Sequence, residues 1–143
     1  MGITVSALDV IGGAAVVGAD AVPGLDIVRL VRRGLPVGAV QVMPDTGRPT
    51  LAELDRIVLP RRTLMNRRKS GTLTPGQSDR LVRLARILAA AEETFGNQAR
   101  AAAWLRHATT ALGGERPLDL LDTDQGARDV EILLGHMAHS IAA

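Results

Sequence analysis

Apolar residues recur every three or four positions along most of this 143-residue chain. The longest stretch with this spacing follows Thr74 and reaches Phe95, and another begins at Ala127 and continues almost to the last residue. This periodicity is typical of α-helices with one buried face. The chain is therefore predicted to be all-α, with a long helix that joins two smaller helical parts. The two apolar faces comprise Leu81, Leu84, Ala85, Leu88, Ala91 and Phe95, and Ala127, Val130, Leu133, Leu134, Met137 and Ile141.

Start and stop signals divide the N-terminal half into short helices. A helix is predicted from Leu25 to Arg33, between the break at Pro23-Gly24 and Gly34. A turn is predicted at Pro44–Gly47, and Thr50–Glu53 has the spacing of a capping box at a helix start. The residues before Pro23 predict only a packed arm or a short helix.

Similar signals organise the C-terminal half. Thr74–Gln77 is a second capping box and opens the long helix. Asn97 is expected to cap a helix that ends near Leu112, and Asp122 with Gln125 is expected to cap the last helix.

Two short helices joined by a tight turn are predicted between Thr50 and Gly71, which is the helix-turn-helix pattern. The first ends at Leu59-Pro60, and the second is crowded with arginine. Leu64, and with it Met65, is expected on the inner face of the second helix.

The turn departs from the usual pattern. Val58 lies close to the position where glycine usually provides a positive φ, and Pro60 replaces the usual Ser or Thr cap. We therefore expect a modified turn.

Charge is distributed unevenly, although the formal net charge is only +2. Residues 61–86 hold eight basic residues and one acid, a net of +7, whereas residues 87–143 hold four arginines and eight acids, a net of −4. This separation of basic and acidic residues indicates two kinds of binding partner. Guanidinium groups suit phosphate, so DNA is the expected partner of the basic part; the alternative is a solvated, arginine-rich helix face. The candidate DNA-binding residues are Arg61, Arg62, Thr63, Asn66, Arg67, Arg68 and Lys69.

Composition excludes several other classes. The chain has no cysteine, which excludes disulfides and thiolate metal sites. Only Phe95 and Trp104 are aromatic, which argues against stacking on single-stranded nucleic acid. The longest apolar run, Val10–Ala19, is too short to span a bilayer, and no basic residue precedes it, so we expect a cytoplasmic protein without membrane association.

No catalytic or metal-binding set is recognisable. His136 and His139 lie three residues apart, but a metal site needs further ligands. The carboxylates, including Glu92 and Glu93, are expected at helix starts or on solvated faces. Gly12-Gly13 lacks the spacing of a dinucleotide-binding loop. We therefore expect a protein that is not an enzyme and holds no metal or cofactor.

A series of short motifs closely resembles the Xre/MbcA/ParS antitoxins over roughly residues 25–134. The motifs are Arg62-Thr63-Leu64, Arg67-Arg68-Lys69, Leu73-Thr74-Pro75, Ser78–Leu81, Arg83–Arg86, Phe95-Gly96, Ala103-Trp104-Leu105, Ala111–Gly114, Pro117–Leu121, Thr123, Gly126-Ala127 and Val130. The resemblance implies an N-terminal arm (residues 1–22), an Xre-like helix-turn-helix (23–72), a connecting helix (73–96) and a toxin-binding domain (97–143).

The resemblance also implies partners. The helix-turn-helix would bind operator DNA of the chain's own operon, and the C-terminal domain would occlude the NAD-binding cleft of a RES-domain toxin. Such toxins consume NAD or use it to modify targets. A homodimer within a heterotetramer or larger complex is expected.

The final helix departs from the family pattern. His136 stands where the family usually has Arg, and Ser140 where it has Gly, which favours a steric plug over an ionic one. The predicted toxin-binding residues are Arg128, Glu131, Leu134, Gly135, His136, Met137, His139, Ser140 and Ile141. Two alternatives remain: a stand-alone transcriptional regulator, and a helix-turn-helix that serves only dimerisation.

Overall fold

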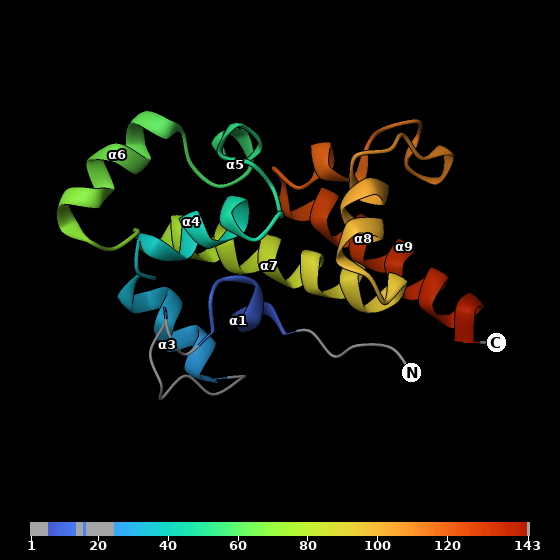
Figure 1. The fold of residues 1–143 in the computed structure, drawn as a ribbon, viewed down its shortest axis with the longest axis horizontal. Helices are drawn as coiled ribbons and strands as arrows, with labels where there is room; N and C mark the ends of the chain where they lie inside the picture. The colour runs from blue at the N-terminus through green and yellow to red at the C-terminus, as the bar shows by residue number, and fades with distance from the viewer. Residues whose placement is uncertain (1–5, 14–15, 17–24, 143) are drawn as a thin grey trace.

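The computed structural model describes residues 6–13, 16 and 25–142, with side chains described over 6–13, 16 and 27–140; the predicted start at Pro23-Gly24 lies outside these residues. The described residues contain helices and no strand, so the predicted all-α class is confirmed (Figure 1). The elements are α1 (Ala7–Val10), α3 (Leu25–Arg33), α4 (Gly38–Asp45), α5 (Leu51–Ile57), α6 (Arg61–Ser70), α7 (Pro75–Phe95), α8 (Gln98–Leu105), the 3-10 turns η1 (Thr110–Leu112) and η2 (Pro117–Leu120), and α9 (Asp124–Ala142).

Helix α7 is the centre of the molecule. It passes through the middle of Figure 1, and α1, α3, α8 and α9 all pack against it. Such a helix must be apolar on more than one side, and Ile87 and Ala89 are indeed buried in addition to the predicted stripe. The Ser78 hydroxyl also accepts a hydrogen bond from the Leu35 amide at 2.9 Å, which fixes the chain that follows α3.

Three predicted caps are confirmed and one is wrong. Both capping boxes form at Thr50 and Thr74, and Asn97 accepts the Arg100 amide at 3.0 Å. The last helix is capped by Thr123, whose Oγ1 accepts the Gly126 amide at 3.0 Å, and not by Asp122. Thr123 lies directly before the first helical residue, which is the position from which a hydroxyl reaches that amide.

Helix α8 ends at Leu105 and not near Leu112. The Thr109 amide donates to the Glu115 carbonyl at 3.0 Å, and Gly113 and Gly114 adopt positive φ angles of 68° and 84°, so the chain closes into a compact turn. The Ala-rich pattern did not show this pairing across the turn.

Two smaller predictions also fail. Pro44 and Asp45 belong to the last turn of α4, so the turn begins at Thr46. Met65 is 65% exposed, which leaves Leu64 as the buried residue of α6.

A close approach at the start of α9 generates a stability prediction. A Cβ on Gly126 would lie 2.8 Å from the Leu120 carbonyl carbon and 2.9 Å from Thr123 Oγ1, whereas a Cβ on Gly135 meets nothing within 4 Å. Gly126→Ala is therefore expected to destabilise the protein by about 2 kcal/mol, as overpacking does. The control Gly135→Ala, in the same helix, is expected to stabilise it by about 0.5 kcal/mol. Thermal unfolding followed by circular dichroism measures both, and equal melting temperatures would contradict the packing of η2 on α9.

Candidate DNA-binding and partner-binding surfaces

The α5–turn–α6 unit has an alternative cap for its second helix. Pro60 provides no side-chain cap, and the Asp55 carboxylate accepts the Arg61 amide instead, at 2.9 Å. Val58 has φ −110° and ψ −61°, so no positive φ is needed at the place where glycine was expected. The Arg80 Nε donates to the Val58 carbonyl at 3.0 Å and ties the turn to α7. The predicted modified turn is therefore confirmed, with Asp55 as its unforeseen cap.

Helix α6 lies at an end of the molecule (Figure 1), and most of its basic residues are exposed. Of the seven predicted DNA-binding residues, Thr63 and Arg67 are half-buried, and the Arg67 Nε donates to the Thr72 carbonyl at 2.9 Å. No acid occurs within the helix, and the Asp55 carboxylate lies at its N-terminal end, where it accepts the Arg61 amide. The exposed residues are Arg61, Arg62, Asn66, Arg68 and Lys69.

The predicted toxin-binding residues lie on different sides of α9. Arg128 pairs with Asp124 at 2.9 Å within the helix, and Glu131 pairs with Arg86 of α7 at 3.0 Å. Leu134 is 2% exposed, so its assignment as a contact residue is wrong, because its side chain is buried in this chain's own core. The Ile141 side chain lies outside the described residues. The exposed members include Gly135, His136, His139 and Ser140, and Met137 is half-buried.

One flank of α9 carries a groove, and His136 is the one predicted toxin-binding residue among its lining residues. We call it the α9 groove; its volume is about 630 Å³ and its walls come from η1, η2 and α9. Its lining residues are Ala111, Leu112, Gly113, Leu120, Asp129, Ile132, Leu133 and His136. One signal was available: Ile132 lies beside the apolar stripe and not in it, which is unusual for a large aliphatic residue on a helix.

Charged pairs join α5 to the C-terminal part. The Arg106 guanidinium holds the Glu53 carboxylate through hydrogen bonds of 2.7 and 3.0 Å, and this lowers the pKa of Glu53. Asp119 accepts hydrogen bonds from Arg116 and from Arg56, both of which lower its pKa, Arg116 more strongly. We call these side chains the seam.

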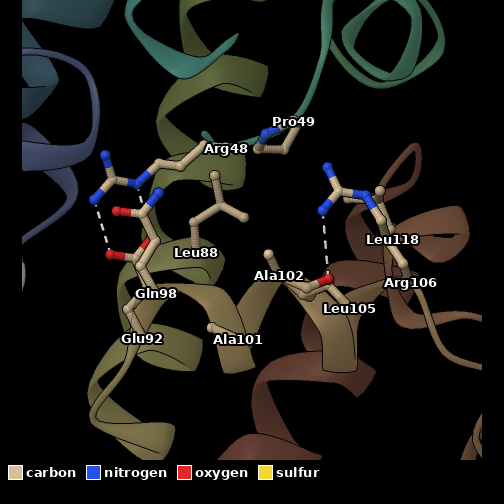
Figure 2. A pocket seen from close by; sticks show the side chains of 10 residues that line it. All are labelled: Arg48, Pro49, Leu88, Glu92, Gln98, Ala101, Ala102, Leu105, Arg106 and Leu118. Atoms are coloured by element: carbon tan, nitrogen blue, oxygen red, sulfur yellow. Dashed lines mark hydrogen bonds and ion pairs between the residues drawn. The ribbon is translucent and has the colours of Figure 1, made fainter. Parts of the chain in front are cut away.

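A further ion pair, which is buried, joins Arg48 to Glu92 of α7. Glu92 is 4% exposed and accepts Arg48 Nε at 2.7 Å and Nη2 at 2.8 Å, which corrects the expectation of a solvated carboxylate. Figure 2 shows Arg48 and Arg106 at two ends of a pocket, with Leu88 and Ala101 between them. Its volume of about 10 Å³ has room for roughly one water molecule, so it is too small for a cofactor.

Other site types find no support in the part of the chain that the structure describes. No three His, Asp or Glu side chains gather there as metal ligands, and His136 and His139 are both exposed. No described helix combines the length and the apolar character that crossing a bilayer requires.

Two family models match consecutive parts of the chain. Residues 26–86 match the antitoxin Xre-like helix-turn-helix domain, and residues 90–139 match the C-terminal toxin-binding domain of antitoxins Xre/MbcA/ParS. An Antitoxin Xre of Yersinia enterocolitica is 30% identical over 128 residues, which cover 87% of this chain and 86% of the relative. The chain belongs to the Xre antitoxin family. Its members are binding and regulatory proteins and not enzymes, as predicted.

Two further Xre antitoxins are similar to this chain. One from Pseudomonas putida is 38% identical over 97 residues, covering 67% of this chain and 60% of the relative. One from Photorhabdus laumondii is 31% identical over 117 residues, covering 80% and 79%. Helix α6 lies within the helix-turn-helix match, and the whole α9 groove lies within the toxin-binding match.

The seam of this Xre antitoxin generates a pH prediction. The lowered pKa of Glu53 means that its pair with Arg106 stabilises the fold above the ordinary pKa of 4.5, and that this stabilisation is lost as the pH falls through the lowered value. Glu53→Gln keeps a side-chain oxygen for the Thr50 cap but removes the charge. It is expected to cost about 1 kcal/mol at pH 7 and little at pH 3.

Chemical denaturation at several pH values measures this difference. Glu115→Gln is the control, because Glu115 is exposed and no side-chain ion pair is seen for it among the described residues. A cost of Glu53→Gln that is the same at pH 7 and pH 3 would contradict a charge-dependent seam.

Proposed function

We propose that this chain neutralises a RES-domain toxin by covering its NAD-binding cleft with α9, and that a dimer of the chain represses its own operon in the cytoplasm through α6. The observation that carries the proposal is the pairing, on one helical scaffold, of an exposed basic helix and a domain of the toxin-binding family. The RES class follows from the resemblance of the sequence motifs.

The exposed C-terminal turns of α9 support a steric mode of occlusion. His136, His139 and Ser140 are exposed, and Met137 is half-buried beside them. No arginine is present from Asp129 to the end of the chain, so a guanidinium plug at this place is excluded. A partner cleft would therefore be closed by side-chain volume and hydrogen bonds.

Neutralisation is tested with a purified RES-domain toxin, the class of partner that the proposal names. NAD consumption, or NAD-dependent modification of a target, is expected to stop at an equimolar amount of antitoxin. Ser140→Arg adds bulk and charge where the cleft would close, and is expected to weaken inhibition about tenfold or more. Arg100→Ala, on α8, is the control and should inhibit like the wild type. Undiminished toxin activity with excess wild-type antitoxin would contradict the proposal.

DNA binding is supported by the charge and exposure of α6. Arg62 and Arg68 are exposed and no acid of the same helix neutralises them, so they are available to phosphates. Asn66 and Met65 lie on the same short helix, and an Asn amide and an apolar side chain are suited to adenine and to the thymine methyl group. The alternative, a helix-turn-helix that serves dimerisation alone, predicts no promoter binding.

Replacing Arg62 and Arg68 by Ala is expected to weaken promoter binding at every salt concentration. It should also reduce the slope of log K against log salt by about 0.9 for each lost phosphate contact. Arg67 is left intact, because its Nε holds the Thr72 carbonyl. Fluorescence anisotropy with a promoter fragment measures the slope, and replacement of Arg100 and Arg128, both outside the helix-turn-helix, is the charge-matched control.

Measuring promoter binding and toxin inhibition separately distinguishes the main proposal from its alternatives. A stand-alone regulator binds the promoter and leaves the toxin active, whereas an antitoxin that lacks operator binding does the reverse. An identical salt slope for the α6 double variant and its control would contradict the assignment of DNA binding to α6.

A further inference from the structure

The α9 groove contains the one large apolar side chain that is well exposed among the described residues after α6. Ile132 is 57% exposed at the middle of α9, directly after Glu131. Half-buried Leu112, Leu120 and Leu133 line the groove next to it. Together they form a small apolar surface, which is suited to contact with an apolar side chain of another molecule.

The walls of the groove are fixed before anything binds. The backbone pair of Thr109 with Glu115 closes the turn that contains η1, and the positive φ angles of Gly113 and Gly114 hold its shape. On the other wall, the close approach of Gly126 to the Leu120 carbonyl fixes η2 against α9. A groove with a preformed backbone binds a partner at a lower ordering cost.

Polar groups at the rim define the partner's chemistry. Asp129 lies on one part of the rim, oriented by the Gln125 amide at 2.9 Å, and exposed His136 lies about two turns of helix further along on the rim. An aliphatic or aromatic side chain fits the apolar floor, and a lysine or arginine next to it would meet Asp129.

We propose that the α9 groove is a docking site for the toxin, which inserts an apolar side chain beside Ile132 and places a basic residue against Asp129. The proposal rests on the proposed function, and it adds an anchoring surface on the flank of α9 to the occluding C-terminal turns. A toxin is the occupant because every lining residue, from Ala111 to His136, lies within the 90–139 match to the toxin-binding domain.

The test compares Ile132→Arg with Met65→Arg in the full-length chain. Both side chains are well exposed, so both variants should keep the wild-type melting temperature, but Met65 lies on α6. Titration calorimetry with a purified RES-domain toxin that the wild-type chain neutralises is expected to show binding weakened about 30-fold or more by Ile132→Arg, as for a central interface anchor, and unchanged by Met65→Arg. Asp129→Lys should weaken binding about tenfold, and less so at high salt.

The other possible outcomes contradict either the docking site alone or the proposed function with it. Binding of Ile132→Arg with wild-type affinity overturns the groove as the docking site but leaves the proposed function standing. A wild-type chain that does not bind the RES-domain protein contradicts the proposed function and the docking site with it. If light scattering shows that Ile132→Arg turns a dimer into a monomer while toxin affinity is unchanged, the groove is a contact between two copies, and the proposal is overturned.

Discussion

Both halves of this antitoxin bury their apolar surface on the same helix, α7, and the rest of the structure depends on this shared helix. The helix-turn-helix match ends at residue 86 and the toxin-binding match begins at residue 90, so the boundary falls inside a continuous helix of 21 residues. No flexible linker separates the halves. Leu81 and Leu84 are buried before the boundary, and Ala91 after it. The DNA-binding and toxin-binding surfaces are therefore held in a fixed relation by helix packing, which is stiff because protein interiors are close-packed.

The seam adds orientation to this packing. Exposed ion pairs contribute little to stability by themselves, but a bidentate pair such as Glu53 with Arg106 fixes direction as well as distance. Glu53 also accepts the Thr50 amide and so completes the cap of α5. One carboxylate thus serves the first helix of the helix-turn-helix and the end of α8 at the same time. A shift of α8 relative to α5 would therefore disturb the start of the helix-turn-helix itself.

Local features of the fold were predictable from the sequence, and tertiary ones were not. Thr50 and Thr74 cap helices by contacts within four residues, so their spacing was sufficient. The charge of α6 is likewise a property of one segment. The burial of Glu92 depends on Arg48, which lies 44 residues earlier, and the cap of α6 comes from Asp55 in the preceding helix. The α9 groove requires η1 to fold back, which depends on the pairing of Thr109 with Glu115 after an Ala-rich helix that the sequence pattern continued too far. Leu134 was predicted as a toxin contact for a similar reason. Periodicity places a residue on a face of a helix but does not say whether the core or a partner covers that face.

The arrangement also constrains how toxin and DNA can influence each other. The exposed residues of α6 and the lining of the α9 groove have no residue in common, and α6 lies at the opposite end of the molecule from the C-terminus of α9 (Figure 1). Direct competition for one surface is therefore excluded for an occupant of the groove. Two packed routes connect that occupant to the helix-turn-helix. One runs through η2, which forms one wall of the groove, and the contact of Asp119 with Arg56 to α5, and the other runs through α7, on which α9 packs. The route through η2 ends on α5, the helix that precedes the turn of the helix-turn-helix. That turn is itself held by Arg80 of α7, which donates to the Val58 carbonyl. An equilibrium coupling between the two sites would then be reciprocal, since an occupant that shifts α5 toward its DNA-binding position is bound more tightly when DNA is present.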